Sequence, residues 1–338
     1  MGLIYINRMQ IERTGAEAAD VARIGAHREW LAFEDLLIDC LRELGHELVL
    51  QTYHPDIPED REGAEFAIYA HVTRRDLEGD LFYKQMHLRE LFTIDRLGWG
   101  ADHSASGRMP DLSHIDSVAA RDFCLELRES FIATGRSKHP QPPVASGTRY
   151  PEGYVFVPVQ RPNDYVSVHH SGIGVPDFIR MISAWGNSVG RNIVFKLHPD
   201  NRFDPEVIAV ARECASQYER VHLMDGNIHD LVANAAGIFT INSGVGFESL
   251  IHGRPVATFG NCDYRWATFN ATPGTIDAAL KYLLDFSDAD RDHQWRFIYH
   301  YWHHHGYSIA PGYLDQSRGR LLKYLEEATA ALHGHEVS

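Results

Sequence analysis

The chain has 338 residues, 44% of them hydrophobic, and a formal net charge of -14. This length predicts two domains of about 150 residues each. The acidic balance argues against a nucleic-acid partner, which usually needs a basic face, but it is compatible with a local basic pocket for a phosphorylated ligand.

Targeting signals and cysteine clusters are missing from the sequence pattern. No run approaches the roughly 18 uninterrupted apolar residues of a membrane span, and the first residues lack the basic and apolar regions of a signal peptide. The cysteines lie far apart, which favours neither a zinc site nor a disulfide framework. We therefore expect a cytoplasmic protein.

The first half of the chain has an α/β pattern. Trp30, Leu37 and Leu41 recur at helical spacing and predict an amphipathic helix over residues 28–45. Apolar runs predict strands over residues 47–53 and 65–72, and a further helix is expected over residues 116–134, with Phe123 on its apolar face.

Residues 83–106 mix apolar side chains with charged ones and with glycines, and two interpretations are open. One is a surface loop whose charges are solvated. The other is an acceptor-facing loop in which carboxylates and hydroxyls contact a hydroxyl-rich substrate, and glycines let the backbone approach it. The candidate residues for that second role are Glu90, Asp95, Asp102 and Ser104.

A segment rich in Pro, Gly and Ser, residues 135–153, is typical of a linker. The apolar runs beyond it predict strands over residues 154–159, 193–197, 221–224 and 237–241. Helical spacing predicts helices over residues 176–185, 204–220, 275–286 and 315–332. Because strands that alternate with helices form parallel sheets, a second α/β domain is expected to begin near residue 154.

Polar residues follow two of these strands. Lys196 and His198 end one strand, and Asn242, Ser243 and Gly244 follow another and lead directly into a helix. Ligands bind beyond the carboxyl ends of parallel strands, and a helix N-terminus attracts phosphate. We expect the two strand ends to be neighbours and to form an anion site.

Three motifs carry a resemblance to a known family. They are VPVQRPND, KLHP and INSGVGFESLIHGRPVATFG, and over residues 150–265 they resemble the bacterial capsule polysaccharide biosynthesis family, the retaining β-Kdo transferases of capsule and O-antigen assembly. The resemblance implies an α/β, GT-B-like fold with two Rossmann-like domains facing a cleft. The expected parts are an acceptor-side domain (1–150), a nucleotide-sugar-binding domain (151–300) and a C-terminal helical segment (301–338) that packs back on the first domain.

The resemblance also assigns roles to individual residues. It implies that His198 and Ser243 hold the CMP phosphate, and that Asp164 of the Gln-x-x-x-Asp motif is the catalytic carboxylate, with Gln160 as its orienting partner. In a retaining transfer through two inversions Asp164 would be the nucleophile. The family usually has a second hydroxyl residue where this chain has Gly244, so the backbone N–H groups up to Gly246 would contribute more.

Structural roles are the alternative for each of these residues. Asp164 would be a turn or N-cap aspartate, and His198 a structural histidine before a proline turn. Lys196 would point to the opposite face of the sheet. Glu248 would accept hydrogen bonds from a ribose or, alternatively, would only complement the helix dipole.

The function that the resemblance implies is transfer of Kdo from CMP-Kdo, with retention, onto a surface-polysaccharide or glycolipid acceptor, including lipopolysaccharide. The expected partners are the nucleotide sugar and the glycan acceptor, with peripheral association at the inner face of the membrane or with the assembly machinery as a further option. Two alternatives are open: a non-catalytic GT-B-like binding module, and a UDP-sugar transferase or epimerase. No cofactor and no metal is expected.

Four histidines near the C-terminus, His300 and His303 to His305, suggest a metal site at first sight. Adjacent histidines on a helix point in different directions, and no carboxylate completes a ligand set. An aromatic packing segment between the domains is therefore the favoured interpretation of residues 295–307.

Overall fold

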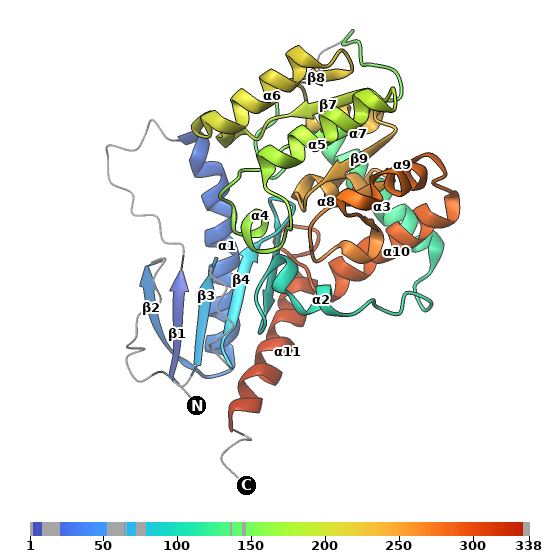
Figure 1. Cartoon of the computed structure of the whole chain (residues 1–338). Helices are drawn as coiled ribbons and strands as arrows, with labels where there is room; N and C mark the ends of the chain where they lie inside the picture. The colour runs from blue at the N-terminus through green and yellow to red at the C-terminus, as the bar shows by residue number, and fades with distance from the viewer. Residues whose placement is uncertain are drawn as a thin grey trace. The chain divides into compact units, whose positions relative to one another are not determined.

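The computed structural model describes residues 3–8, 21–52, 64, 66–71, 79–135, 137–143 and 147–333. The chain divides into two compact units (Figure 1). Unit 1 contains Met1–Ser104 and Trp302–Ser338, and unit 2 contains Ala105–Tyr301. In the part of the chain that is described, none of the helices combines the length and the apolar character needed to cross a membrane.

Unit 1 is built on a six-stranded sheet in the order β12-β5-β4-β3-β1-β2. Strands β1, β2, β3 and β4 run parallel to one another, and β5 pairs antiparallel with both β4 and β12. The strands are β1 (Leu3–Arg8), β2 (Glu47–Thr52), β3 (Phe66–Ala70), β4 (Leu81–Gln85), β5 (Leu91–Asp95) and β12 (Tyr307–Ser308). The helices are α1 (Val21–Glu43) and α11 (Leu314–His333).

The core of unit 1 joins α1 and α11 to one face of the sheet. Phe33 of α1 stacks on Phe92 of β5 with ring centroids 4.4 Å apart, and Leu321 and Leu325 of α11 are buried in the same cluster. The C-terminal segment is therefore part of the same compact unit as residues 1–104. The predicted strand at residues 65–72 matches β3, although Glu65 and Val72 lie outside the described residues.

Residues 83–106 do not form the solvated surface loop considered above. They begin inside β4 and include all of β5, and both strands are buried along their whole length. The polar residues in β4 and β5 made these strands difficult to recognise from the sequence. Their polar side chains are buried and contact other residues of the unit. Lys84, for example, lies over the ring of Trp99, with Nζ 3.2 Å from the centroid.

Unit 2 contains a six-stranded, fully parallel sheet in the order β11-β10-β9-β6-β7-β8. Its strands are β6 (Val155–Pro158), β7 (Ile193–Lys196), β8 (Val221–Leu223), β9 (Gly237–Thr240), β10 (Val256–Thr258) and β11 (Phe269–Asn270). Its helices are α3 (Ser117–Thr134), α4 (Tyr165–His169), α5 (Val175–Ser188), α6 (Pro205–Gln217), α7 (Ile228–Asn234), α8 (Gly244–Ile251) and α9 (Ile276–Leu284), together with most of α10 (Asp288–His304). The short α2 (Ser104–Gly107) lies at the unit boundary.

The strand order places a topological switch point between β6 and β9. From β6 the chain builds outward through β7 and β8, and it then returns to the other side of β6 to build β9, β10 and β11. Ligands of open parallel sheets bind outside the carboxyl ends of the strands at such a point. The expectation that β7 and β9 are neighbours is therefore wrong, because β6 lies between them.

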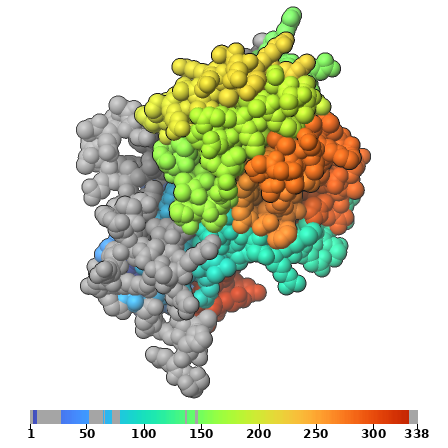
Figure 2. Space-filling model, viewed as in Figure 1, coloured from blue at the N-terminus to red at the C-terminus, as the bar shows by residue number. Residues whose placement is uncertain are grey.

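Apolar side chains from α5, α6 and α9 share one core cluster with the strands of this sheet. The close approach of α5 depends on Gly186, where a Cβ would lie only 2.4 Å from Cγ1 of Ile193 on β7. On the face seen in Figure 2, the segment after β6 adjoins the segment after β10, and an antiparallel bridge between Ser171 and Gly260 joins them.

The boundary between the units differs from the expected one near residue 150. Unit 2 already begins at Ala105, because α3 packs on α8 and the following segment is anchored to α7. Asn227 Nδ2 donates to the carbonyl of Pro142 at 3.0 Å, and the amide of Ile228 donates to Gln141 Oε1 at 3.1 Å. The described part of the predicted linker is therefore held on unit 2 by specific hydrogen bonds.

Candidate active site

Two side chains connect the loops that follow β6 and β9. Gln160 Nε2 donates to Asn242 Oδ1 at 2.8 Å, and the backbone N–H of Asn242 donates to Gln160 Oε1 at 2.9 Å. Both residues are buried. This reciprocal pair fixes the two loops at the switch point relative to each other.

Both polar atoms of the Asn242 side chain are hydrogen-bonded within these loops. Its Nδ2 donates to the carbonyl of Val166 at 2.8 Å and to that of Asn261 at 3.2 Å. Gln160 in turn reaches Ser167 Oγ at 3.4 Å. The geometry therefore favours a positioning role for Gln160 and Asn242 rather than direct contact with a ligand.

The helix that follows β9 presents its N-terminus at this edge. Ser243 is the N-cap of α8, and its Oγ accepts a hydrogen bond from the amide of Val245 at 3.2 Å. Because the hydroxyl accepts here, its proton is available for an anion. Ser243 and Gly244 are half-buried, so a ligand can reach both.

The backbone N–H of Gly246 is less available to a ligand than the resemblance implies. Its amide donates to the carbonyl of Ser243 at 2.9 Å, so this N–H is already used inside the first turn of α8. A Cβ at this position would lie 2.5 Å from the hydroxyl of Tyr264, which itself donates to the Ser243 carbonyl. The glycine is thus required for packing of Tyr264 against the helix.

Asp164 stands at the N-cap of α4, but its carboxylate makes no capping hydrogen bond. The backbone carbonyl of Asp164 accepts from the amides of Ser167 and Val168, while the side chain is exposed. The carboxylate of Asp164 therefore does not play the capping role considered as its structural alternative.

His198 lies between a backbone donor and a second histidine. Its Nδ1 accepts from the amide of Asp200 at 3.1 Å, which places the proton of the neutral ring on Nε2. Nε2 lies 3.2 Å from Nε2 of His139. Burial lowers the pKa of His198, and the carboxylates of Asp200 and Asp164 act in the opposite direction.

Lys138 brings a positive charge to the same region. Burial lowers the pKa of Lys138, and the carboxylates of Asp164, Glu248 and Asp263 raise it. Its two neighbours are held in place, since Ser137 Oγ donates to Glu248 Oε1 at 2.8 Å and His139 contacts His198. The segment from Ser137 to His139 thus lines the carboxyl edge of the sheet.

Glu248 is buried in the second turn of α8, where it is 2% exposed. Burial raises its pKa from 4.5 to about 8, while the hydrogen bond from Ser137 and the charge of Lys138 act to lower it. At neutral pH the side chain is therefore mainly a neutral acid, which removes the simple helix-dipole explanation for its presence. Its observed contact is with Ser137.

Lys196 is directed elsewhere. Its Nζ donates to the carbonyl of Gly226 at 2.8 Å, in the loop after β8. Burial lowers the pKa of Lys196, and Asp225 raises it. This bond ties the end of β7 to the loop after β8.

The candidate residues of unit 1 form a separate arrangement. Asp95 is buried and accepts from the amides of Leu97 and Ser104 at 2.8 and 3.2 Å and from Ser104 Oγ at 2.6 Å. Asp102 is also buried, whereas Glu90 is half-buried. Asp95 and Ser104 therefore stabilise the turn that contains Gly98 and Gly100.

Sequence reasoning missed Ser137, Lys138, His139 and Asp263. The first three lie in a Pro- and Gly-rich segment whose composition is that of a linker. A Ser-Lys-His run shortly before the first strand of the domain is the signal that could have directed attention to them. Asp263 is buried and accepts from the hydroxyl of Tyr301 at 2.5 Å, and nothing in its sequence context distinguishes it.

The two mostly parallel sheets, one of them with its switch point between β6 and β9, define an α/β protein of the GT-B-like class. Residues 138–272 match the model of a family described as capsule polysaccharide biosynthesis protein. This match begins at Lys138 and includes the whole constellation at the edge of the second sheet. It confirms the family resemblance for that segment, and the chain has a Kdo-transferase-like fold.

The proteins that are similar to this chain include two solved structures and one protein sequence. The KpsC β-Kdo 2,4 transferase of Thermosulfurimonas dismutans has a TM-score of 0.51 at 16% identity and covers 82% of this chain and 92% of its own, which shows a shared fold. The β-Kdo 2,7 transferase of the same KpsC gives 0.48 at 14% identity, over 96% of this chain and 99% of its own.

The sequence relative is protein FixF of Sinorhizobium fredii. It is 37% identical over 117 residues, which make up 33% of this chain and 27% of that protein. The chain thus matches only about a quarter of the length of this relative.

Proposed function

We propose that this protein is a glycosyltransferase that moves Kdo from CMP-Kdo, with retention, onto a surface-polysaccharide or glycolipid acceptor. The observation that carries the proposal is the uncapped, exposed carboxylate of Asp164 at the switch point of the sheet. It lies within the segment that matches the capsule biosynthesis family. Within the described part of the chain, this carboxylate makes no capping hydrogen bond to α4.

The phosphate of the donor would bind between α8 and His198. Ser243 can donate its hydroxyl proton, the first turn of α8 adds the positive end of its dipole, and His198 offers Nε2–H. Because His198 Nε2 now faces His139, an incoming phosphate oxygen would take the place of that contact. Because Gly244 has no hydroxyl, Ser243 and His198 would be the two side-chain donors to the phosphate.

Lys138 would counter the negative charge of an acidic donor. A CMP-activated acidic sugar carries both a phosphate and a carboxylate, and the ammonium of Lys138 interacts electrostatically with the carboxylates around it. The mainly neutral form of Glu248 keeps the site from adding a further anion beside the substrate.

In the proposed reaction, an oxygen of Asp164 attacks the anomeric carbon as the bond to the CMP phosphate breaks. The acceptor hydroxyl then attacks the same carbon from the face that CMP left, its proton passes to solvent water, and Asp164 departs as a free carboxylate. Two inversions give net retention. Gln160 and Asn242 hold the loops that carry Asp164 and Ser243, so they preserve the geometry without taking part in the chemistry.

Nucleotide selectivity tests the proposal. Thermal unfolding of the full chain would be followed with CMP, UMP and UDP at equal concentrations, and transfer assayed with CMP-Kdo and glycan acceptors. A ligand present at a hundred times its dissociation constant stabilises by roughly 2.7 kcal/mol. We expect stabilisation by CMP alone. A response to UDP instead would favour a UDP-sugar enzyme, and CMP binding without transfer from any CMP-sugar would favour a non-catalytic module.

A further inference from the structure

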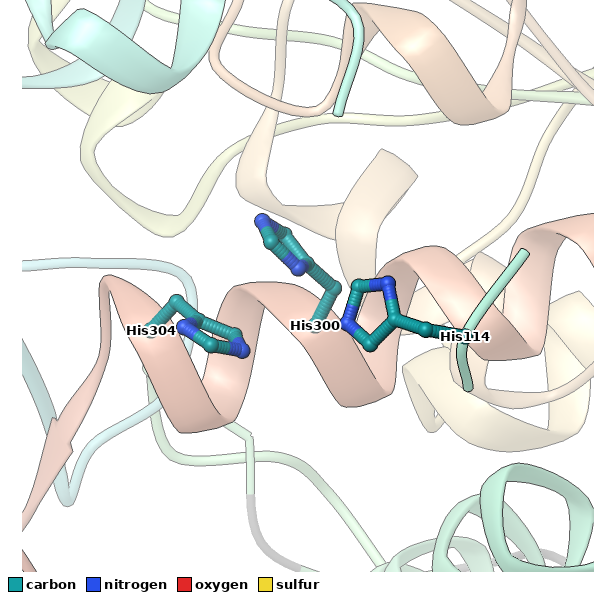
Figure 3. Close-up of side chains that lie close together, drawn as sticks. All are labelled: His114, His300 and His304. Carbon is teal, nitrogen blue, oxygen red and sulfur yellow. The ribbon is translucent and has the colours of Figure 1, made fainter. Parts of the chain in front are cut away.

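Three histidine side chains converge outside the nucleotide site. His300 and His304 lie on α10, and His114 lies in the segment before α3 (Figure 3). One ring nitrogen from each residue falls within 4.8 Å of the other two. His114 and His304 are exposed and His300 is half-buried, so an ion can reach the group from solvent.

The two halves of this group are fixed to each other by contacts near both. Arg296 of α10, one turn before His300, donates from Nη1 to the carbonyl of Ile115 at 2.6 Å, and Ile115 is the residue after His114. Ser117 Oγ also donates to Asp292 of α10. The helix is continuous from Asp288 to His304, so its own backbone places His304 one turn beyond His300.

The spacing along α10 explains why these histidines converge although their neighbours do not. Side chains four residues apart on a helix lie on the same face, one turn above the other. His303 is adjacent to His304, and neighbouring residues on a helix point in different directions. His114 is remote in sequence from both histidines, and only the fold brings it to α10.

Imidazole nitrogens are typical ligands for zinc, at Zn–N distances of about 2.0–2.1 Å. Two nitrogens on one tetrahedral ion are then about 3.4 Å apart. Small side-chain rotations bring atoms that are already within 4.8 Å to this separation. Three imidazoles leave one tetrahedral position for water, which suits a group that is open to solvent.

The surroundings add negative charge. Hydrogen bonds from Ser113 lower the pKa of Asp111, and the charge of His114 acts in the same direction. A carboxylate near the histidines favours a bound cation.

We propose that His114, His300 and His304 bind one divalent zinc ion, which would tie the segment before α3 to the C-terminal part of α10. The site is independent of the proposed transferase activity, because none of its residues belongs to the constellation around Asp164. Its role is therefore a stabilising clip. Since metal ions bind neutral imidazole, acidification competes with binding.

Calorimetric titration of metal-free full-length protein with Zn²⁺ tests this site. The variants are H114A, H300A and H304A, each checked for an unchanged melting temperature in EDTA. Loss of even an outer partner of a metal ligand typically costs 10–100-fold in affinity, so we expect each variant to bind Zn²⁺ at least tenfold more weakly. Zinc should raise the melting temperature of the wild type but not that of the variants.

The matched control is H303A, which removes a histidine next to His304 that points away from the group. It should bind Zn²⁺ as the wild type does. Wild-type affinity in the three variants would overturn the proposal. An equal loss of affinity in H303A, or no zinc binding by the wild type, would also overturn it.

Discussion

The neutral, buried state of Glu248 makes a quantitative prediction about stability. Its pKa is raised from 4.5 to about 8, so between these pH values the folded protein holds a proton that the unfolded chain has lost. Stability then falls as pH rises, by about 1.36 kcal/mol per pH unit. Across the whole interval the loss is on the order of 5 kcal/mol.

Glu248→Gln isolates this effect. The amide oxygen can still accept the hydrogen bond from Ser137 Oγ, but the side chain no longer titrates. Chemical denaturation of both proteins at several pH values gives the difference in free energy of unfolding. We expect the wild type to lose several kcal/mol relative to the variant between pH 5 and pH 8.

Glu213→Gln serves as the control, because Glu213 is exposed on α6. Its stability difference from the wild type should be the same at every pH. A flat difference for Glu248→Gln as well would show that this carboxyl group is not held neutral in the folded protein, and the electrostatic account of the site would fail.

Two further substitutions test neighbouring parts of the site. His198→Ala should weaken CMP binding by about 1.5–3 kcal/mol, the range for a charge-assisted hydrogen bond, and unchanged affinity in calorimetry would remove His198 from the clamp. Gly246→Ala should destabilise the protein by roughly 1–3 kcal/mol, because its Cβ would meet the buried ring of Tyr264. Adding Tyr264→Phe should recover part of that loss in denaturation experiments, and full additivity would contradict the explanation.

Much of unit 2 was predictable from local sequence. Short β-branched runs separated by helical periodicity predict β6, β7, β8 and β9 to within a residue or two, because strands covered on both faces are apolar along most of their length. The order of those strands was not predictable in the same way. Nothing in the sequence indicates that β6 lies between β7 and β9. The prediction that the strand before His198 is next to the strand before Ser243 is therefore wrong.

The candidate site shows a similar division. Asp164, His198 and Ser243 stand in motifs that follow predicted strands, so their common edge could be inferred. Lys138 and His139 could not, because composition describes the average behaviour of a segment and says nothing about single contacts that anchor it. Side chains recruited across long sequence separations, such as His114 at α10, are visible only once the fold is known.

The central claim is that Asp164 becomes covalently bonded to the sugar during transfer. Wild-type protein given CMP-Kdo without acceptor would be analysed by intact-protein and peptide mass spectrometry, in parallel with Asp164→Asn. The amide is nearly isosteric, so the variant should fold and bind CMP normally, yet transfer about 10⁴-fold more slowly. We predict the mass of one Kdo on the wild-type peptide that contains Asp164 and none on the variant. Near-normal transfer by Asp164→Asn, or an adduct on another residue, would contradict the account.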